Sequence, residues 1–182
     1  GKVYAFEPDP ENFAYLKKNV EINNYQNVVC VQKAVSNVNG MSKLYLHKFQ
    51  TGAYTLFGKG DDYIEIETVR LDDFFKDKNQ RVDMIKLDIE GSEGIALFGA
   101  KKILKENKDI KIISEILPEA MKKSGVNTGQ LFNLLIDYGF SIYQINDKSN
   151  GQPLKLINPS QIYEFISEIK IITNIFCIRE NN

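Results

Sequence analysis

The sequence predicts one α/β domain whose sheet is doubly wound and mostly parallel, with helices on both faces. Short apolar segments rich in β-formers alternate with longer segments in which apolar residues recur at helical spacing. The chain has 182 residues, of which 43% are hydrophobic and 26% charged. That size and balance suit a single core of ordinary dimensions.

The first 36 residues predict a strand, a helix and a second strand. KVYAFE, residues 2–7, is short and apolar, as buried strands are. Asp9 is placed to cap a helix with Pro10 at its first position, and Asn23–Asn24 mark its end. The second strand is expected from Asn27 to Ser36.

Residues 37–69 show a different pattern, which indicates an inserted β-hairpin. GMSKLYLHKF and DDYIEIETVRL alternate polar and apolar residues, as half-exposed antiparallel strands do. The glycine-containing loop between them, QTGAYTLFGKG, is the natural lid over a site. His47, Tyr54 and Thr55 are therefore candidate substrate contacts.

Regular alternation resumes after one helical turn at Leu71 to Lys76. We expect strands at Val82–Asp88, Asp109–Leu117, Phe140–Ile145 and Ile169–Ile178, and helices at Ser92–Glu106, Thr128–Tyr138 and Pro159–Ser167. Strands that alternate with helices imply parallel strands joined by helical crossovers.

Acidic residues follow several of these strands. Glu7 ends the first, Asp88 ends the one after the hairpin, and Glu115 lies near the end of the next. Ligands of open parallel sheets bind at the carboxyl ends of the strands, so these side chains are expected along one rim. Glu7 either accepts hydrogen bonds from both hydroxyls of a ribose or, with Asp9, only caps the next helix.

The segment KLDIEGSE, residues 86–93, places three carboxylates at one strand end. Lys86 is positioned to pair with Asp88, and Glu93 falls in the first turn of the next helix, where negative charge suits the helix dipole. Capping does not account for Asp88 and Glu90. Two close negative charges raise a carboxylate's proton affinity, a useful property in a general base or a metal ligand.

Composition narrows the classes of partner. The formal net charge is −1, and no dense Lys/Arg cluster with interleaved aromatics is present, so no nucleic-acid partner is expected. No apolar run approaches the roughly 20 residues that span a bilayer, so we expect a cytoplasmic protein without a membrane partner. A single histidine excludes the usual zinc spacings. Cys30 and Cys177 are expected as buried free thiols, with one disulfide between them as the alternative.

A resemblance to the FkbM family of S-adenosylmethionine-dependent methyltransferases is carried by five blocks in the family's order. They run from Val3 to about Ile145 and read AFEPDPENFAYLKKNVEINN, VQKAVSN, VRLDDFF, DMIKLDIEGSEGIALFGAKKIL and IISEI. KLDIEGSE is the most specific piece, and the FEP block before an Asn-rich helix supports it.

The resemblance implies a Rossmann-like class I methyltransferase fold with an antiparallel last strand. It implies methyl transfer from S-adenosylmethionine, usually to a hydroxyl of a small molecule or sugar. The residues that match cofactor contacts are Glu7, Lys33, Ala34 and Asp88, and the signature at the acceptor side is Asp88, Glu90 and Glu93. The candidate acceptor contacts are then His47, Tyr54, Thr55, Glu93 and Glu115.

The expected chemistry is an in-line displacement at the sulfonium methyl. Asp88 is our first candidate for the base that takes the acceptor's proton and Glu90 our second, with Glu115 or His47 assisting. Alternatively, Asp88 and a neighbouring carboxylate bind Mg²⁺, which lowers the pKa of the acceptor hydroxyl. No metal site is predicted.

The family's fold begins with a strand and a glycine-rich loop, whereas this sequence starts at what would be the second strand. The resemblance therefore implies an N-terminally incomplete domain over residues 1–182, which binds the cofactor weakly or not at all. Two other interpretations stay open. An acidic strand end also suits the ribose of NAD in an oxidoreductase. A non-catalytic module would bind a partner, a second copy included, through an open sheet edge.

Overall fold

The computed structural model describes residues 1–47, 54–59, 61–78, 80–146, 153–169 and 171–180. Its N-terminal unit contains β1 (Val3–Phe6), α1 (Pro10–Ile22) and β2 (Val28–Val31), and the two strands pair in parallel. The Asp9 carboxylate accepts hydrogen bonds from the amides of Glu11 and Asn12, so it caps α1 as the sequence predicts. Asn24 ends the helix in the left-handed conformation, with φ +54°.

The inserted segment forms a small sheet of its own. β4 (Gly40–Tyr45) pairs antiparallel with β5 (Tyr63–Val69), and β3 (Ala34–Val35) joins β5 in parallel. The strand expected over Asn27–Ser36 is therefore two strands. The chain turns where the Lys33 amide bonds the Val31 carbonyl, and this turn transfers it from β1 to a new partner, β5.

The largest sheet has five strands in the order β6-β7-β10-β8-β9. They are β6 (Met84–Leu87), β7 (Lys111–Ile116), β10 (Thr173–Ile178), β8 (Ser141–Ile145) and β9 (Leu154–Leu156). β6 and β7 are parallel, whereas β10 runs antiparallel between β7 and β8, and β8 is antiparallel to β9. The antiparallel last strand was expected.

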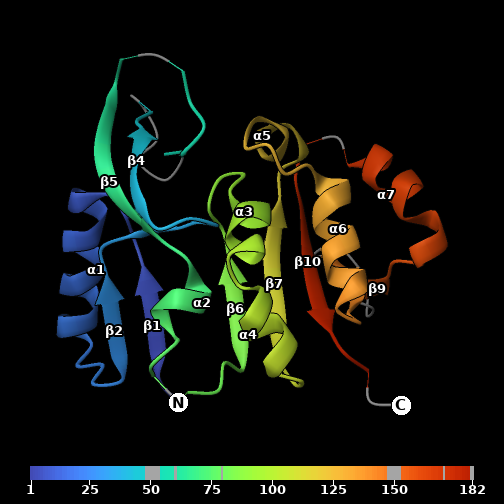
Figure 1. The fold of residues 1–182 in the computed structure, drawn as a ribbon, viewed down its shortest axis with the longest axis horizontal. Coiled ribbons are helices and arrows are strands. Elements are labelled where there is room, and N and C mark those ends of the chain that lie inside the picture. The colour runs from blue at the N-terminus through green and yellow to red at the C-terminus, as the bar shows by residue number, and fades with distance from the viewer. Residues whose placement is uncertain (48–53, 60, 79, 147–152, 170, 181–182) are drawn as a thin grey trace.

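The predicted α/β class is confirmed, but a single mostly parallel sheet is not found among the described residues. The described strands form three separate sheets, because β3 leaves the first pair and joins β5. The β1–β2 sheet is parallel, whereas the other two sheets are mixed in direction. β1 and β6 run in the same direction (Figure 1), yet among the described residues β1 pairs only with β2 and β6 only with β7.

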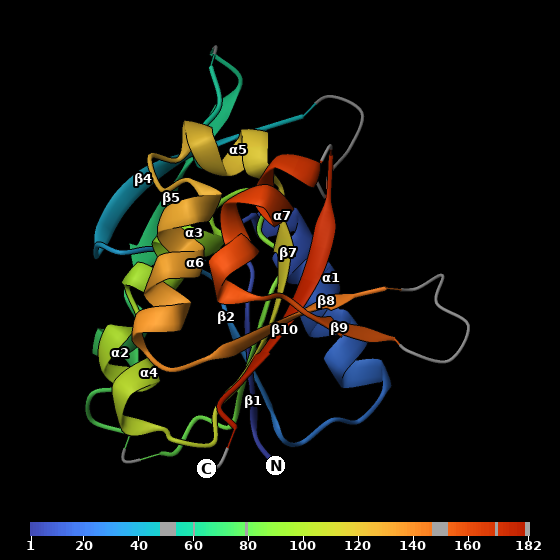
Figure 2. The same ribbon diagram turned by 90° about the vertical axis from the view of Figure 1, so that its right-hand side faces the viewer.

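The helices lie mainly on one side of the strands. Figure 2 shows α2 (Leu71–Phe74), α3 (Glu93–Phe98), α4 (Lys101–Glu106) and α6 (Thr128–Asp137) on one side and α1 on the other. The remaining helices are α5 (Pro118–Lys123), η2 (Pro159–Gln161) and α7 (Ile162–Glu168). The sequence analysis did not predict α5 or β9.

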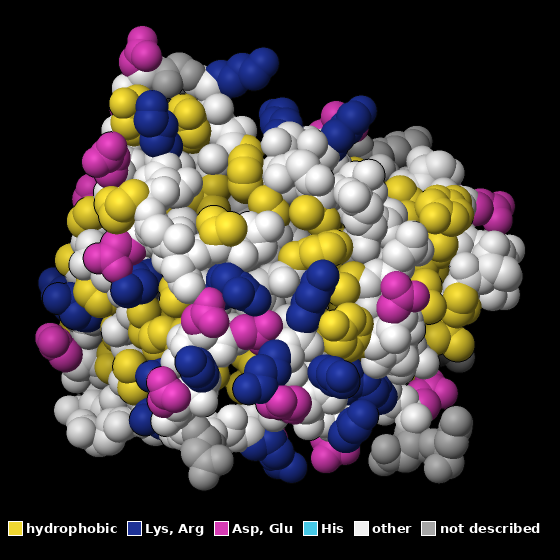
Figure 3. Space-filling model, viewed as in Figure 1, with side chains coloured by type: hydrophobic (Ala, Val, Ile, Leu, Met, Phe, Trp, Pro, Cys, Tyr) yellow, Lys and Arg dark blue, Asp and Glu magenta, His cyan; other side chains and the backbone are white. Residues whose placement is uncertain are grey.

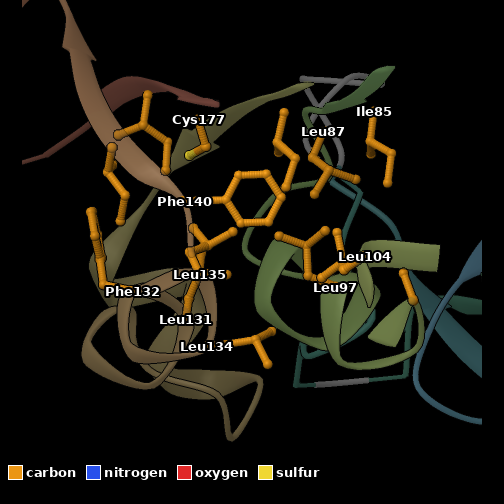
Figure 4. Packing of buried hydrophobic residues seen from close by; sticks show 14 of the residues in the cluster. Ile85, Leu87, Leu97, Leu104, Leu131, Phe132, Leu134, Leu135, Phe140 and Cys177 are labelled. Carbon is orange, nitrogen blue, oxygen red and sulfur yellow. The ribbon is translucent and has the colours of Figure 1, made fainter. Parts of the chain in front are cut away.

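The main core lies between the five-stranded sheet and these helices (Figure 4). Leu97, Leu104 and Leu135 are fully buried there, close to Leu87 and Cys177. Burial alternates along the strands: in β6 Ile85 and Leu87 are buried while Met84 and Lys86 are exposed. The expectation that helices bury both faces is therefore not met in the described part of β6, since one face carries exposed side chains.

The helix expected over Ser92–Glu106 is divided into α3 and α4. A Cβ atom at Gly99 would lie 2.1 Å from the carbonyl oxygen of Ser36, so the chain needs glycine where α3 packs against the insertion. The Asp72 carboxylate then accepts hydrogen bonds from the amides of Lys102 and Ile103, both at 3.0 Å. α4 is thus capped by a residue from another helix.

The surface charges, the helices and the two cysteines can each be compared with what the composition led us to expect. Lys/Arg and Asp/Glu side chains are interspersed over the face drawn in Figure 3. None of the described helices is long and apolar enough to cross a bilayer. Cys30, half-buried, and Cys177, buried, are both free thiols.

Candidate active site

The acidic residues that were expected at one rim lie at one edge of the fold. Glu7 follows β1, Asp88 follows β6, and Glu115 is the second-last residue of β7. These strands point the same way (Figure 1), so their carboxyl ends share an edge. The register that pairs Leu87 with Ser114 puts Asp88 opposite Glu115 one residue later.

One carboxylate oxygen of Glu7 accepts a hydrogen bond, and the other makes none to the described residues. Its Oε1 accepts a hydrogen bond from the Asp9 amide at 2.8 Å, so Glu7 does take part in the entry to α1. Partial burial raises the pKa of Glu7, and the Asp9 charge adds to this, while the amide bond opposes it. The second oxygen of Glu7 is therefore able to accept a hydrogen bond from a hydroxyl of a ligand.

A small, mainly apolar pocket is lined by Phe6 and Pro8, the residues on either side of Glu7. Its lining comes from the ends of β1, β2 and β6 and from the insertion: Phe6, Pro8, Lys33, Ala34, Val35, Leu44, Tyr54, Leu56, Ile89 and Ser92. The structure thus brings together three predicted site residues, Lys33, Ala34 and Tyr54. The Lys33 ammonium lies 2.5 Å from a Glu67 carboxylate oxygen, so its charge is paired and its stem forms the wall.

Ser92 contributes the pocket's unpaired polar atom. Its side chain is 2% exposed, and its Oγ has no hydrogen-bond partner among the described residues. Buried hydroxyls are normally satisfied, so this one in the pocket wall is available to a water or to a polar group of a bound molecule. Sequence patterns did not indicate that this hydroxyl lines a pocket, because a serine before a helix is usually a cap.

The loop after β6 has an unusual backbone. Glu90 and Gly91 adopt left-handed conformations, with φ +53° and +91°. At Gly91 a Cβ atom would lie 2.5 Å from the Cβ of Ala120, so only glycine fits against α5. Glutamate has no such freedom, and this conformation costs it on the order of 1 kcal/mol.

Glu93 lies beneath this loop and is completely buried. Its Oε1 accepts hydrogen bonds from the amides of Ile89, at 2.9 Å, and Gly91, at 3.3 Å. Burial raises the pKa of Glu93, although these amide bonds lower it. Oε2 has no partner among the described residues. This position favours a role in holding the loop over direct contact with an acceptor.

The exposed Asp88 and the half-buried Glu90 and Glu115 form the more accessible part of the acidic group. Lys86 Nζ lies 3.1 Å from Asp88 Oδ2, the pair that the spacing predicts. Partial burial, followed by the Asp88 charge, raises the pKa of Glu90. Burial and the charges of Asp88, Glu90 and Glu93 raise the pKa of Glu115. Both glutamates are therefore better proton acceptors near neutral pH than an isolated glutamate.

The insertion reaches this loop through Thr55. Thr55 Oγ1 donates a hydrogen bond to the Glu90 carbonyl oxygen at 3.3 Å. His47, by contrast, is exposed two residues beyond β4 and makes no hydrogen bond to the described residues of the site. Of the expected lid, residues 50–60, residues 50–53 and 60 lie outside the described residues. Within the described ranges, no three His, Cys, Asp or Glu side chains are grouped so that they could hold a metal ion.

Comparisons with known proteins agree with this architecture. Residues 1–142 match the family model described as the methyltransferase FkbM domain. The crystal structure of the methyltransferase FkbM from Methylobacillus flagellatus KT aligns with a TM-score of 0.55 at 16% identity, over 97% of this chain and 36% of that chain. The present chain thus spans about a third of that protein's length, and the likeness shows the fold alone.

A second solved structure is less similar. It is the precorrin-6y C5,15-methyltransferase from Geobacter metallireducens GS-15, with a TM-score of 0.47 at 10% identity, over 99% of this chain and 68% of that chain. No curated protein matches the sequence.

Proposed function

Because this chain belongs to the FkbM methyltransferase domain family, we propose that its site binds S-adenosylmethionine and directs the methyl group to a hydroxyl oxygen of a small molecule or sugar. The observation that carries the proposal is one juxtaposition. An apolar pocket lined by both sequence neighbours of Glu7, the Glu7 carboxylate and the acidic loop at residues 88–93 meet at the carboxyl ends of β1 and β6.

The residues present fit the cofactor. The apolar walls of Phe6, Ala34 and Tyr54 suit a planar base, and the orphaned Ser92 hydroxyl would meet a polar atom of that base. The free oxygen of Glu7 would accept from a ribose hydroxyl. When bound, S-adenosylmethionine supplies a methyl carbon attached to a positively charged sulfur. The negative charge of Asp88, Glu90 and Glu115 favours a cation at this rim.

The acidic loop supplies the proton acceptor. An alcohol is a poor nucleophile at neutral pH, so a base must take its proton as the oxygen attacks. From the sequence, Asp88 was our first candidate for the base and Glu90 the second. In the structure Asp88 is paired with Lys86 at 3.1 Å, whereas the pKa of Glu90 is raised. We therefore assign the base to Glu90 and a supporting charge to Asp88, with Glu115 as their neighbour.

The cofactor part of the proposal is tested by a ¹⁵N NMR titration of the chain with S-adenosylmethionine and S-adenosylhomocysteine, which detects weak binding as well as strong. We expect amide shifts at Ala34, Tyr54 and Ile89, and weaker binding for Glu7→Gln. Glu11→Gln, an exposed carboxylate in the first turn of α1, is the matched control. No shift at these amides in millimolar ligand would contradict the proposal.

The acceptor class is tested by release of S-adenosylhomocysteine with matched acceptors. Sugars and small alcohols are compared with the corresponding amines and thiols. We expect turnover with the hydroxyl compounds and its loss in Glu90→Gln. Turnover with the amines alone would contradict transfer to oxygen.

A further inference from the structure

The backbone of Glu90 is held from two sides. From below, the buried Glu93 carboxylate binds the amides of Ile89 and Gly91, the residues on either side of Glu90. From above, the Thr55 hydroxyl binds the Glu90 carbonyl oxygen, across 35 residues of sequence. Two hydrogen bonds accepted by Glu93 from the amides on either side of Glu90, and one donated by the distant Thr55 to Glu90 itself, therefore hold the backbone around a residue in a disfavoured conformation.

A simple turn would not need glutamate at this position. Glycine and asparagine adopt positive φ readily, and the other described non-glycine residue with positive φ is Asn24, at the end of a helix. A glutamate side chain here is present against the preference of its backbone. Strain of this kind persists only where surrounding contacts impose it, and it gathers at functional sites.

We propose that Glu93 and Thr55 are positioning residues that hold the Glu90 carboxylate beside Asp88 and Glu115. The inserted β4–β5 segment then contributes to the geometry of the proton-accepting group rather than only covering the pocket. The inference rests on the proposed function in one respect, the assignment of Glu90 as the group that meets the acceptor.

Thr55 is itself firmly placed. Its backbone pairs with Tyr45 through two hydrogen bonds, of 2.8 and 3.2 Å, and its hydroxyl also accepts from the Phe57 amide at 3.3 Å. The adjacent Tyr54 lines the cofactor pocket. Residues 54 and 55 thus contact both the pocket wall and the acidic loop, so the insertion connects the two halves of the site.

The pKa of Glu90 depends on where its carboxylate lies, so a titration of Glu90 detects a change in its position. The charged groups near it are Asp88 and Lys86 from the end of β6, Glu93 from α3 and Glu115 from β7. Held in place, Glu90 is partly shielded from water and close to Asp88. Without the hydrogen bonds from Thr55 and to Glu93, the Glu90 side chain would turn toward solvent, and its pKa would fall toward the ordinary value of about 4.3.

The test is a ¹³C NMR titration of the Glu90 side-chain carboxyl in the 182-residue chain. Thr55→Val removes the hydroxyl at nearly constant shape, and Glu93→Met removes the carboxylate acceptor. We expect a lowered Glu90 pKa in both. Glu93→Gln removes the same charge as Glu93→Met but keeps an acceptor oxygen for the two amides, so it should retain most of the raised value. Ser92→Ala, which removes a buried hydroxyl that makes no hydrogen bond to the loop, is the control.

The outcomes distinguish positioning of Glu90 by Thr55 and Glu93 from an effect of charge alone. Equal Glu90 pKa values in wild type and Thr55→Val would overturn the role of Thr55, and this variant keeps the test decisive if Glu93→Met does not fold. Equal lowering in Glu93→Gln and Glu93→Met would mean that charge, not positioning, is responsible. A wild-type Glu90 with an ordinary pKa would also overturn the inference. None of these results depends on cofactor binding, so failure of the proposed function is recognised separately in the ligand titration.

Discussion

The Asp72 carboxylate lies 3.0 Å from the amide nitrogen of Ile103, 31 residues further along the chain. Its other oxygen lies equally close to the Lys102 amide. Asp72 belongs to the four-residue helix α2, so a residue outside α4 satisfies the free amides at the start of α4. This contact fixes where α3 ends and α4 begins, and it joins the helices to the segment that leaves the insertion.

We predict that Asp72→Ala lowers the free energy of unfolding by about 1–2 kcal/mol, the usual loss for a removed N-cap. Asp72→Asn keeps one acceptor oxygen and should lose less. The measurement is urea unfolding followed by circular dichroism. Asp77→Ala, an exposed aspartate a few residues away, is the control, and an equal loss in that variant would show that charge rather than capping is responsible.

Arg179 joins two helix ends to the last strand. Its guanidinium donates to the carbonyl oxygens of Tyr138 at 2.7 Å, Asn107 at 2.9 Å and Lys108 at 3.1 Å, and also to that of Leu104. The group also lies 4.2 Å from the ring centre of Phe140. Lysine cannot reproduce this fork of donors.

Arg179→Lys should therefore lower the unfolding free energy by about 1.5–3 kcal/mol, the range for lost hydrogen bonds to a charged group. Arg81→Lys, which changes an exposed ion pair with Asp83, should have little effect. Thermal unfolding compares the two. Similar melting temperatures for both variants would contradict the role of Arg179.

Sequence rules succeeded where the signal was local. Asp9, Pro10 and Asn24 defined α1, and alternation identified β4 and β5. The rule that ligands gather at strand ends placed Glu7, Asp88 and Glu115 at one edge. The rules failed where the cause lay far along the chain. The break at Gly99 follows from contacts with Ser36 and Asp72, which no periodicity within the helix reveals.

The apolar lining of the pocket could not be predicted from the sequence for a related reason. Phe6, Leu44 and Ile89 look like ordinary core residues in the sequence, because an apolar pocket wall and an apolar core have the same composition. The hydrogen bond between Thr55 and Glu90 joins residues 35 positions apart, and its partner is a backbone oxygen, which carries no sequence signature. The left-handed φ of Glu90 was hidden because glutamate is not a residue that signals it.

Backbone strain at Glu90 can be measured by comparing two truncations. Glu90→Ala removes the carboxylate but keeps the Cβ atom that resists positive φ, whereas Glu90→Gly removes both. Glycine normally costs stability relative to alanine, through the greater freedom of the unfolded chain. At position 90 we predict the reverse, with Glu90→Gly the more stable by up to about 1 kcal/mol. Chemical unfolding of both variants measures the difference. A more stable Glu90→Ala would show that the left-handed conformation is not strained.

Four glutamates at this edge of the fold should make the folded chain less stable as pH rises, the opposite of the usual effect of carboxylates. The pKa values of Glu7, Glu90, Glu93 and Glu115 are all raised in the folded chain. Between the ordinary value of about 4.3 and these raised values the folded state binds more protons than the unfolded state. The contribution of these groups is therefore favourable at low pH and is lost as pH rises through their folded pKa values.

Glu115→Gln removes one of these groups from a partly exposed position. We predict that its stability relative to wild type increases as pH rises above about 4.3, because the variant has no carboxyl to deprotonate there. Melting temperatures of both proteins from pH 4 to 8 give this difference. Glu119→Gln, an exposed residue in the first turn of α5, should track wild type throughout. A difference between Glu115→Gln and wild type that does not vary with pH would contradict the assignment.

The facing edges of β1 and β6 give the last prediction. Within the described residues each of these strands is hydrogen-bonded on one side only, and Val3 and Met84 on them are 50% and 53% exposed. Unpaired strand edges with apolar side chains recruit further strands. We therefore predict that the chain self-associates as its concentration rises, and that Val3→Lys with Met84→Lys shifts it toward monomer in sedimentation velocity. Ile22→Lys, which changes an apolar residue on α1 that is 66% exposed, is the control. If all three proteins sedimented as monomers at high concentration, the edges would not be sites of association; if Ile22→Lys alone restored the monomer, the contact would run through the helix.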